Sequence, residues 1–79
     1  MLDNAEALRK EIGHRIKVRR VECNMLQKDL GAALGDVKQT QVSEWEGGRR
    51  ALRMEDAIAI AKALNTSVGY LAGEQPRAA

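Results

Sequence analysis

The chain has 79 residues, enough for one compact domain and too few for a second. Its only aromatic residues are Trp45 and Tyr70, so a core must be built from aliphatic side chains, which favours packed helices over a sheet. With a formal net charge of +2, one cysteine and no long apolar run, the sequence excludes an internal disulfide and a membrane span, and we expect a cytoplasmic protein.

The first predicted helix covers residues 5–22, after a short N-terminal arm at residues 1–4. Leu8, Ile12 and Ile16 are spaced four apart and therefore share one helical face. Asn24 follows this segment, and asparagine tolerates the left-handed conformation that ends helices. The segment is also rich in positive charge, which suits a polyanionic partner but equally fits a solvated helix face. Its basic residues are Arg9, Lys10, Arg15, Lys17, Arg19 and Arg20.

A short second helix is predicted at about residues 27–34, where Leu30 and Leu34 are four apart. Gly35 is placed to end it. Asp36 is a suitable N-cap for a third helix, and Gln39 three residues later completes the pattern of a capping box. We therefore expect the third helix at about residues 37–46.

This third helix is predicted to be amphipathic. Val42 and Trp45, three residues apart, mark its buried side. Its outward side chains carry amides, hydroxyls and a carboxylate, which can read base edges in the DNA major groove. These side chains are Gln39, Thr40, Ser43 and Glu44. An isolated helix with such a face is more often simply solvated, so the assignment depends on its context.

Two further helices complete the predicted domain, which spans residues 5–72. Gly47 and Gly48 end the third helix, and a basic run to Arg53 leads into the fourth. The predicted buried stripe of the fourth helix consists of Met54, Ala57, Ile58, Ala61 and Leu64. Thr66 or Ser67 can cap a short fifth helix that ends near Leu71, and residues 73–79 are expected to form a flexible tail.

The segment from Ile12 to Leu71 resembles the lambda-repressor-like, Cro/C1-type helix-turn-helix regulators of the xenobiotic-response-element family. The residues that carry the resemblance are Gln27, Leu30, Gly31, Leu34, Gly35 and the run Val42-Ser43-Glu44-Trp45-Glu46. The turn departs from the family pattern, because Asp36 and Val37 stand where one apolar residue is usual. Lys38 stands where a Ser or Thr often caps the recognition helix, so we expect Asp36 to take over the capping.

The resemblance implies an all-α bundle of five short helices that binds double-stranded DNA and regulates transcription as a repressor or autoregulator. The recognition helix would read bases through Gln39, Thr40, Ser43 and Glu44. Contacts to phosphates are expected from Gln27, Lys38, Gln41, Arg49 and Arg50. Capping of its own helix is the rival role of Gln27, and Arg50 can equally be solvated.

Further expectations follow from the family. Arg20 and Glu46 match a structural ion pair of related repressors. A homodimer on a two-fold operator is expected, because one module this small makes few contacts and two copies can read half-sites about 34–36 Å apart. Val68, Tyr70 and Leu71 are candidates for the dimer interface, although the same residues can instead close the core.

Two rival functions are considered. The first is a protein-interaction module on the same fold, either a bridging factor or an antitoxin whose main partner is a toxin. The second is an enzyme that uses His14 or Cys23, but these residues would lie about 13 Å apart along one helix, too far for a catalytic pair. The sequence indicates no metal-ligand spacing, no cofactor motif and no membrane partner. Its length leaves little room for a separate ligand pocket.

Overall fold

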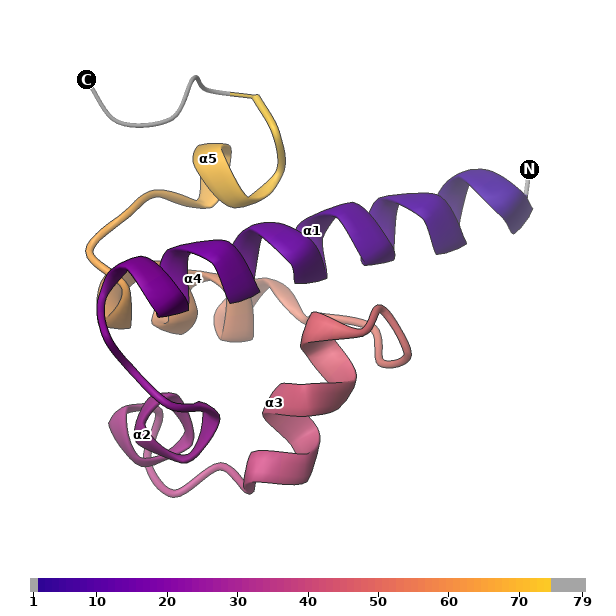
Figure 1. Cartoon of the computed structure of the whole chain (residues 1–79). Helices are drawn as coiled ribbons and strands as arrows, with labels where there is room; N and C mark the ends of the chain where they lie inside the picture. The colour runs from indigo at the N-terminus through magenta and orange to yellow at the C-terminus, as the bar shows by residue number, and fades with distance from the viewer. Residues whose placement is uncertain (1, 75–79) are drawn as a thin grey trace.

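The computed structural model describes residues 2–74, and their side chains from residue 4 onward. The predicted all-α bundle of five helices is confirmed (Figure 1). The helices are α1 (Leu2–Glu22), α2 (Gln27–Ala33), α3 (Gln39–Glu46), α4 (Met54–Ala63) and α5 (Val68–Leu71). No strand occurs over the described range.

The long helix α1 runs across the whole molecule (Figure 1). Helices α2 and α3 lie on one side of it, α4 passes behind it, and α5 lies on the side opposite to α2 and α3. The first turns of α1 extend beyond the other helices. Because α2 and α3 form one end of the bundle, their outward surfaces are not covered by the rest of the described chain.

The core draws at least one residue from every helix. Its buried hydrophobic residues are Ile16, Leu30, Val42, Trp45, Ile60, Ala61, Leu64, Tyr70 and Leu71. Tyr70 and Leu71 are only 9% and 1% exposed, so of the three candidate interface residues only Val68 reaches the surface. Their burial therefore supports the alternative that Tyr70 and Leu71 close the core.

The predicted buried stripe of α4 is partly wrong. Met54 and Ile58 are 66% and 42% exposed, whereas Ile60, which was not expected inside, is fully buried beside Ala61 and Leu64. Helix α4 carries apolar side chains on two neighbouring stripes, and helical periodicity cannot choose between them. Leu8 on α1 is likewise half exposed.

The ends of the elements follow local backbone chemistry. Asn24 has a positive φ of 58° after α1, and the Ser67 hydroxyl accepts a hydrogen bond of 3.0 Å from the Tyr70 N–H at the start of α5. Helix α1 begins at Leu2, so residues 2–4 are helical and do not form the expected arm. Within the expected tail, the Glu74 N–H bonds to the Gly69 carbonyl at 2.8 Å, and residues 75–79 lie outside the described range.

Gly13 sets the distance between α1 and α3. A Cβ atom at this position would clash with the Trp45 carbonyl oxygen and would lie 2.6 Å from the Glu46 carbonyl oxygen. Both obstacles are backbone atoms, which cannot rotate away. Only glycine therefore permits α1 to lie this close to the end of α3.

We predict that Gly13→Ala destabilises the protein, although alanine is the better helix former by about 1 kcal/mol. Overpacking of a close contact costs about 1–3 kcal/mol, and here it should outweigh the gain in helix propensity. Urea denaturation followed by circular dichroism measures the difference. If Gly13→Ala instead raised the free energy of unfolding by about 1 kcal/mol, the gain in helix propensity alone, then α1 and α3 would not be in close backbone contact.

Candidate nucleic-acid interface

The turn between α2 and α3 contains two successive left-handed residues. Gly35 has a φ of 86° and Asp36 a φ of 67°. Val37 then returns toward the core, and its N–H donates to the Gly31 carbonyl at 2.9 Å. Asp and Asn are among the non-glycine residues that best tolerate this conformation, which explains an aspartate here.

The expected capping role of Asp36 is wrong. Helix α3 begins at Gln39, two residues later than predicted, and its N-cap is Lys38, which makes no side-chain capping bond. Asp36 instead provides the left-handed turn residue, so it lies too early to reach the first N–H groups of α3. Helix α2 starts with a side-chain bond of its own, because the Asp29 carboxylate accepts from the Leu26 N–H at 2.8 Å.

Helix α3 presents the amphipathic surface that its sequence predicts. Val42 and Trp45 are buried, and Gln39 and Thr40 at its first turn are exposed. The outward residues of the following turns are only half exposed. They are Gln41, Ser43 and Glu44. The N-terminal turn of α3 is therefore the part of the helix that is most accessible to a large partner.

Arg20 and Glu46 form a buried ion pair between the ends of α1 and α3. Arg20 Nε lies 2.6 Å from Glu46 Oε2, and Arg20 Nη2 lies 3.1 Å from Glu46 Oε1. The remaining Arg20 Nη1 donates to the Met25 carbonyl at 2.7 Å, which holds the turn between α1 and α2. The two side chains are only 10% and 4% exposed, and this bidentate geometry is the strongest form of the Arg–carboxylate contact.

A chain of hydrogen bonds continues from this ion pair to the surface. Gln27 Nε2 donates to Glu46 Oε1 at 3.0 Å, and Gln39 Nε2 lies 3.5 Å from Gln27 Oε1. Three residues that were assigned separate roles from the sequence are thus linked: an ion-pair carboxylate, a phosphate ligand and a base-reading amide. The spacing of these residues in the sequence does not reveal the link, because it joins the two ends of α3 through the first residue of α2.

Glu44 and Arg50 also form a pair that the sequence did not predict. Arg50 Nε lies 2.7 Å from Glu44 Oε1, and both side chains remain substantially exposed. The contact becomes possible because Gly47 and Gly48 reverse the chain after α3, with Gly48 at a φ of 73°. One oxygen of Glu44 is therefore engaged by an arginine, and the negative charge on this face is partly neutralised.

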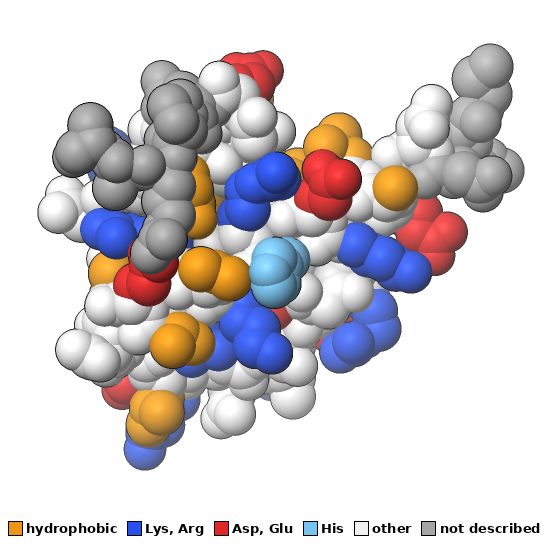
Figure 2. All heavy atoms as spheres, turned by 45° about the horizontal axis from the view of Figure 1, so that its top comes forward, with side chains coloured by type: hydrophobic (Ala, Val, Ile, Leu, Met, Phe, Trp, Pro, Cys, Tyr) orange, Lys and Arg blue, Asp and Glu red, His pale blue; other side chains and the backbone are white. Residues whose placement is uncertain are grey.

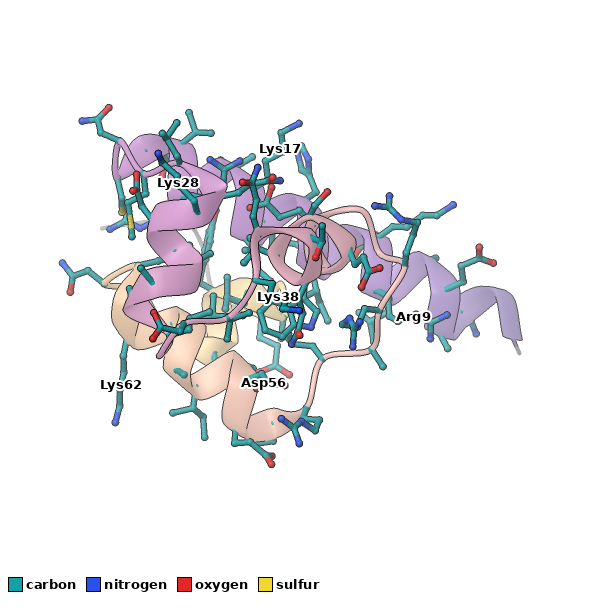
Figure 3. All side chains as sticks on the ribbon, turned by 90° about the horizontal axis from the view of Figure 1, so that it is seen from below. Arg9, Lys17, Lys28, Lys38, Asp56 and Lys62 are labelled. Carbon is teal, nitrogen blue, oxygen red and sulfur yellow. The ribbon has the colours of Figure 1, made fainter. Side chains whose placement is uncertain are left out.

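Several cations surround the outward end of α2 and α3, as the view from below shows (Figure 3). Lys38 is exposed at the start of α3, and Lys28 is exposed in the first turn of α2. Arg49 is also exposed, and its guanidinium lies over Gly47. Lys28 was not singled out by sequence reasoning, although its position next to Gln27 at a helix N-terminus was a usable signal.

Much of the positive charge of α1 is compensated. Lys10, Arg15 and Arg19 each lie within 4.0 Å of a glutamate of the same helix, and Arg20 pairs with Glu46. Arg19 also donates to the Leu64 carbonyl at 2.8 Å and so satisfies the C-terminal end of α4. Figure 2 shows basic and acidic side chains interspersed on the face around the single histidine. This face of α1 is therefore not a uniformly positive surface.

The two residues considered for catalysis have other surroundings. His14 is exposed on α1, and Cys23 is half-buried with its thiol 3.5 Å from the Leu64 carbonyl. Within the described part of the chain, no three His, Cys, Asp or Glu residues are grouped to hold a metal ion. Between residues 2 and 74, no helix has both the length and the apolar character needed to cross a bilayer.

A family model described as helix-turn-helix matches residues 16–71, which is more than half of the chain. The matched segment begins in the middle of α1 and ends with α5, so it includes all the elements that build the surface described above. A comparison with curated proteins finds no match.

We predict that Glu46→Ala lowers the free energy of unfolding by about 3–5 kcal/mol, because it leaves Arg20 buried without a counter-charge. Glu44→Ala is the matched control. Its ion pair with Arg50 is exposed, so the loss should not exceed about 1 kcal/mol. If urea denaturation gave the same loss in the free energy of unfolding for both variants, the buried pair would be no more important for stability than the exposed one.

Proposed function

Because the chain belongs to the Cro/C1-type helix-turn-helix family of DNA-binding regulators, we propose that it is a transcriptional repressor or autoregulator that reads an operator with α3. Its place of action is then the nucleoid, in the cytoplasm, and its role is that of a regulator and not of an enzyme. The observation that carries the proposal is the exposed first turn of α3, whose leading amide is held in one orientation by the hydrogen bonds below it.

The orientation of Gln39 follows from the order of donors and acceptors. A carboxylate only accepts, so the nitrogen of the Gln27 amide must face Glu46, and the Gln27 oxygen must face Gln39. Gln39 therefore turns its nitrogen toward Gln27. Its oxygen and its second N–H remain for a partner, and adenine offers the matching N6–H donor and N7 acceptor in the major groove.

The other base contacts are ranked by their exposure. Thr40 is exposed beside Gln39 and can contact a thymine methyl group or donate one hydrogen bond. Ser43 and Glu44 lie farther along α3 and are half-buried. Glu44 keeps one carboxylate oxygen for a cytosine amino group, while its pairing with Arg50 limits the repulsion from nearby phosphates.

Phosphate binding is proposed for residues on both sides of the first turn of α3. Lys38 and Lys28 are exposed cations on this face, and Arg49 and Arg50 follow α3. Gln27 stands at the N-terminus of α2, where unpaired backbone N–H groups favour an anion. Gln41 is half exposed and is proposed as a further contact.

We further propose a homodimer on a two-fold related operator. Val68 lies in an apolar groove together with Ile12, Leu52, Met54 and Ala57. Exposed apolar surface of this kind marks protein contacts, and the exposed Met54 gives it an apolar rim. Since Tyr70 and Leu71 are core residues, the proposed interface uses Val68 and its neighbours on α4. A toxin or another protein partner is the alternative occupant of this groove.

We predict that selection from random duplex DNA enriches an inverted repeat, and that Gln39→Ala relaxes the preference at one base pair in each half-site. The cost there should be about 1–3 kcal/mol, the value of a bidentate base contact. Fluorescence anisotropy with the selected operator and its single-base variants measures it. No enrichment of any sequence would remove the base-reading role and favour the protein-interaction module.

Lys38→Ala should weaken binding to all sequences by the same factor, because a phosphate contact carries no base information. It should also reduce the slope of log K against log salt by about one unit, since one counterion fewer is released. Lys62→Ala, an exposed lysine of α4 that points away from Lys28 and Lys38 in Figure 3, is the control and should leave the slope unchanged. A base-specific loss for Lys38→Ala would argue against a phosphate contact.

A further inference from the structure

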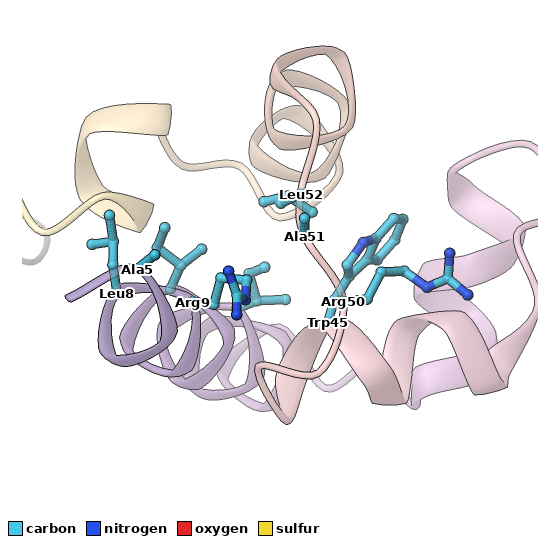
Figure 4. Close-up of a pocket in the computed structure, with 9 residues that line it drawn as sticks. Ala5, Leu8, Arg9, Trp45, Arg50, Ala51 and Leu52 are labelled. Carbon is cyan, nitrogen blue, oxygen red and sulfur yellow. The ribbon is translucent and has the colours of Figure 1, made fainter. Parts of the chain in front are cut away.

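Arg49 and Arg50 are neighbours in the segment that follows α3, but their guanidinium groups have different surroundings. Arg49 makes no ion pair among residues 4–74, whereas Arg50 Nε donates to Glu44 Oε1 at 2.7 Å. In Figure 4 the Arg50 side chain lies at a pocket of about 250 Å³ beside Trp45, and its guanidinium is directed away from that pocket. The charge of Arg49 is therefore available for a phosphate, whereas that of Arg50 is compensated by a carboxylate of α3.

The backbone after α3 holds Arg50 next to Glu44. The Arg49 N–H donates to the Glu44 carbonyl at 2.9 Å, so the chain directly before Arg50 is attached to α3. Gly48 makes this return of the chain possible with its φ of 73°, and it is buried against the backbone of Lys10. An exposed ion pair contributes little to stability, so the main effect of this pair is to orient the Arg50 guanidinium.

The ion pair leaves hydrogen-bonding groups of both side chains unused. Arg50 Nη1 and Nη2 have no hydrogen-bond partner among residues 4–74, and this side chain is 47% exposed. Over the same range Glu44 Oε2 also has no partner, and its side chain is 40% exposed. Guanidinium nitrogens only donate and a carboxylate only accepts. The pair therefore offers two donors next to one acceptor.

These donors and this acceptor match the major-groove edge of a G·C base pair. Guanine presents the two acceptors N7 and O6, and the paired cytosine presents its N4 amino donor beside them. An A·T pair presents an acceptor, a donor and an acceptor, so it cannot satisfy all three groups. A phosphate offers only acceptors, and its negative charge is repelled by the Glu44 carboxylate. A G·C pair is therefore a better partner for the ion pair than a phosphate is.

We propose that Glu44 and Arg50 together read one G·C base pair in each half-site, an inference that rests on the proposed reading of an operator by α3. Arg50 Nη1 and Nη2 donate to guanine O6 and N7, and Glu44 Oε2 accepts from the cytosine N4 amino group. Arg50 is then a specificity-determining residue outside α3, in place of the phosphate contact that its position next to Arg49 suggests. Arg49 keeps its proposed contact to a phosphate.

The first test compares two arginine variants on the operator selected from random duplex DNA and on its single-base variants. The unmodified protein should prefer G·C over A·T by about tenfold or more at one position of each half-site. Arg50→Met keeps the apolar stem of the side chain and should lose this preference. Arg49→Met is the matched control, and it should weaken binding to all sequences by the same factor. Fluorescence anisotropy measures the affinities.

The second test changes the base and uses the unmodified protein, so it does not depend on the folding of a variant. In the selected operator, 7-deazaguanine replaces each guanine of a half-site in turn, which removes the N7 acceptor and keeps the base pairing. At one guanine the replacement should weaken binding by about tenfold, the value of a hydrogen bond to a charged group. The affinity of Arg50→Met should not change at that guanine. The same replacement outside the half-sites is the control.

The outcomes separate this inference from the proposed function. The inference is wrong if Arg50→Met weakens binding to all sequences equally, because Arg50 would then contact a phosphate. It is also wrong if no guanine of the half-site responds to 7-deazaguanine. In both cases an operator is still selected, so the proposed reading by α3 stands. If the selection enriches no sequence, the proposed function itself fails and the reading of a G·C pair fails with it.

Discussion

The buried ion pair between Arg20 and Glu46 joins the ends of the helices that build the proposed DNA-binding surface. It fastens the end of α1 to the end of α3, and the third donor group of Arg20 holds the turn before α2 through the Met25 carbonyl. A buried charge pair contributes little net stability compared with apolar packing, but it tolerates only one geometry. The position of α3 relative to α1 and α2 therefore depends on this contact, with Gly13 permitting the close approach.

The proposed base-reading surface is an extension of the same contact. The Glu46 carboxylate orients the Gln27 amide, and the Gln27 oxygen in turn accepts from the exposed Gln39 amide, so this carboxylate sets which end of the Gln39 amide faces Gln27. Side chains that are held before binding lose less conformational entropy when they bind. Farther along the helix, the pairing of Glu44 with Arg50 partly neutralises the negative charge on the proposed base-reading surface.

The far side of the molecule has a different character. Between the N-terminal half of α1 and the segment after α3, the surface is hollowed by a pocket that is lined by apolar side chains and by Arg9. Trp45 thus has one face in the core and one edge at the cavity, at the end of the helix whose start faces the proposed operator.

The sequence by itself determined the number and order of helices, the amphipathic character of α3 and the left-handed stop at Asn24, because these depend on local periodicity and backbone preference. It could not choose between the two apolar stripes of α4, so Ile60 replaced Ile58 in the core. It also assigned Asp36 to a cap, whereas the approach of Val37 to Gly31 made it a turn residue. The link from Arg20 to Gln39 and the cavity beside Trp45 were decided only by tertiary structure, since each brings together residues from separate helices whose relative placement is set by packing and not by spacing along the chain.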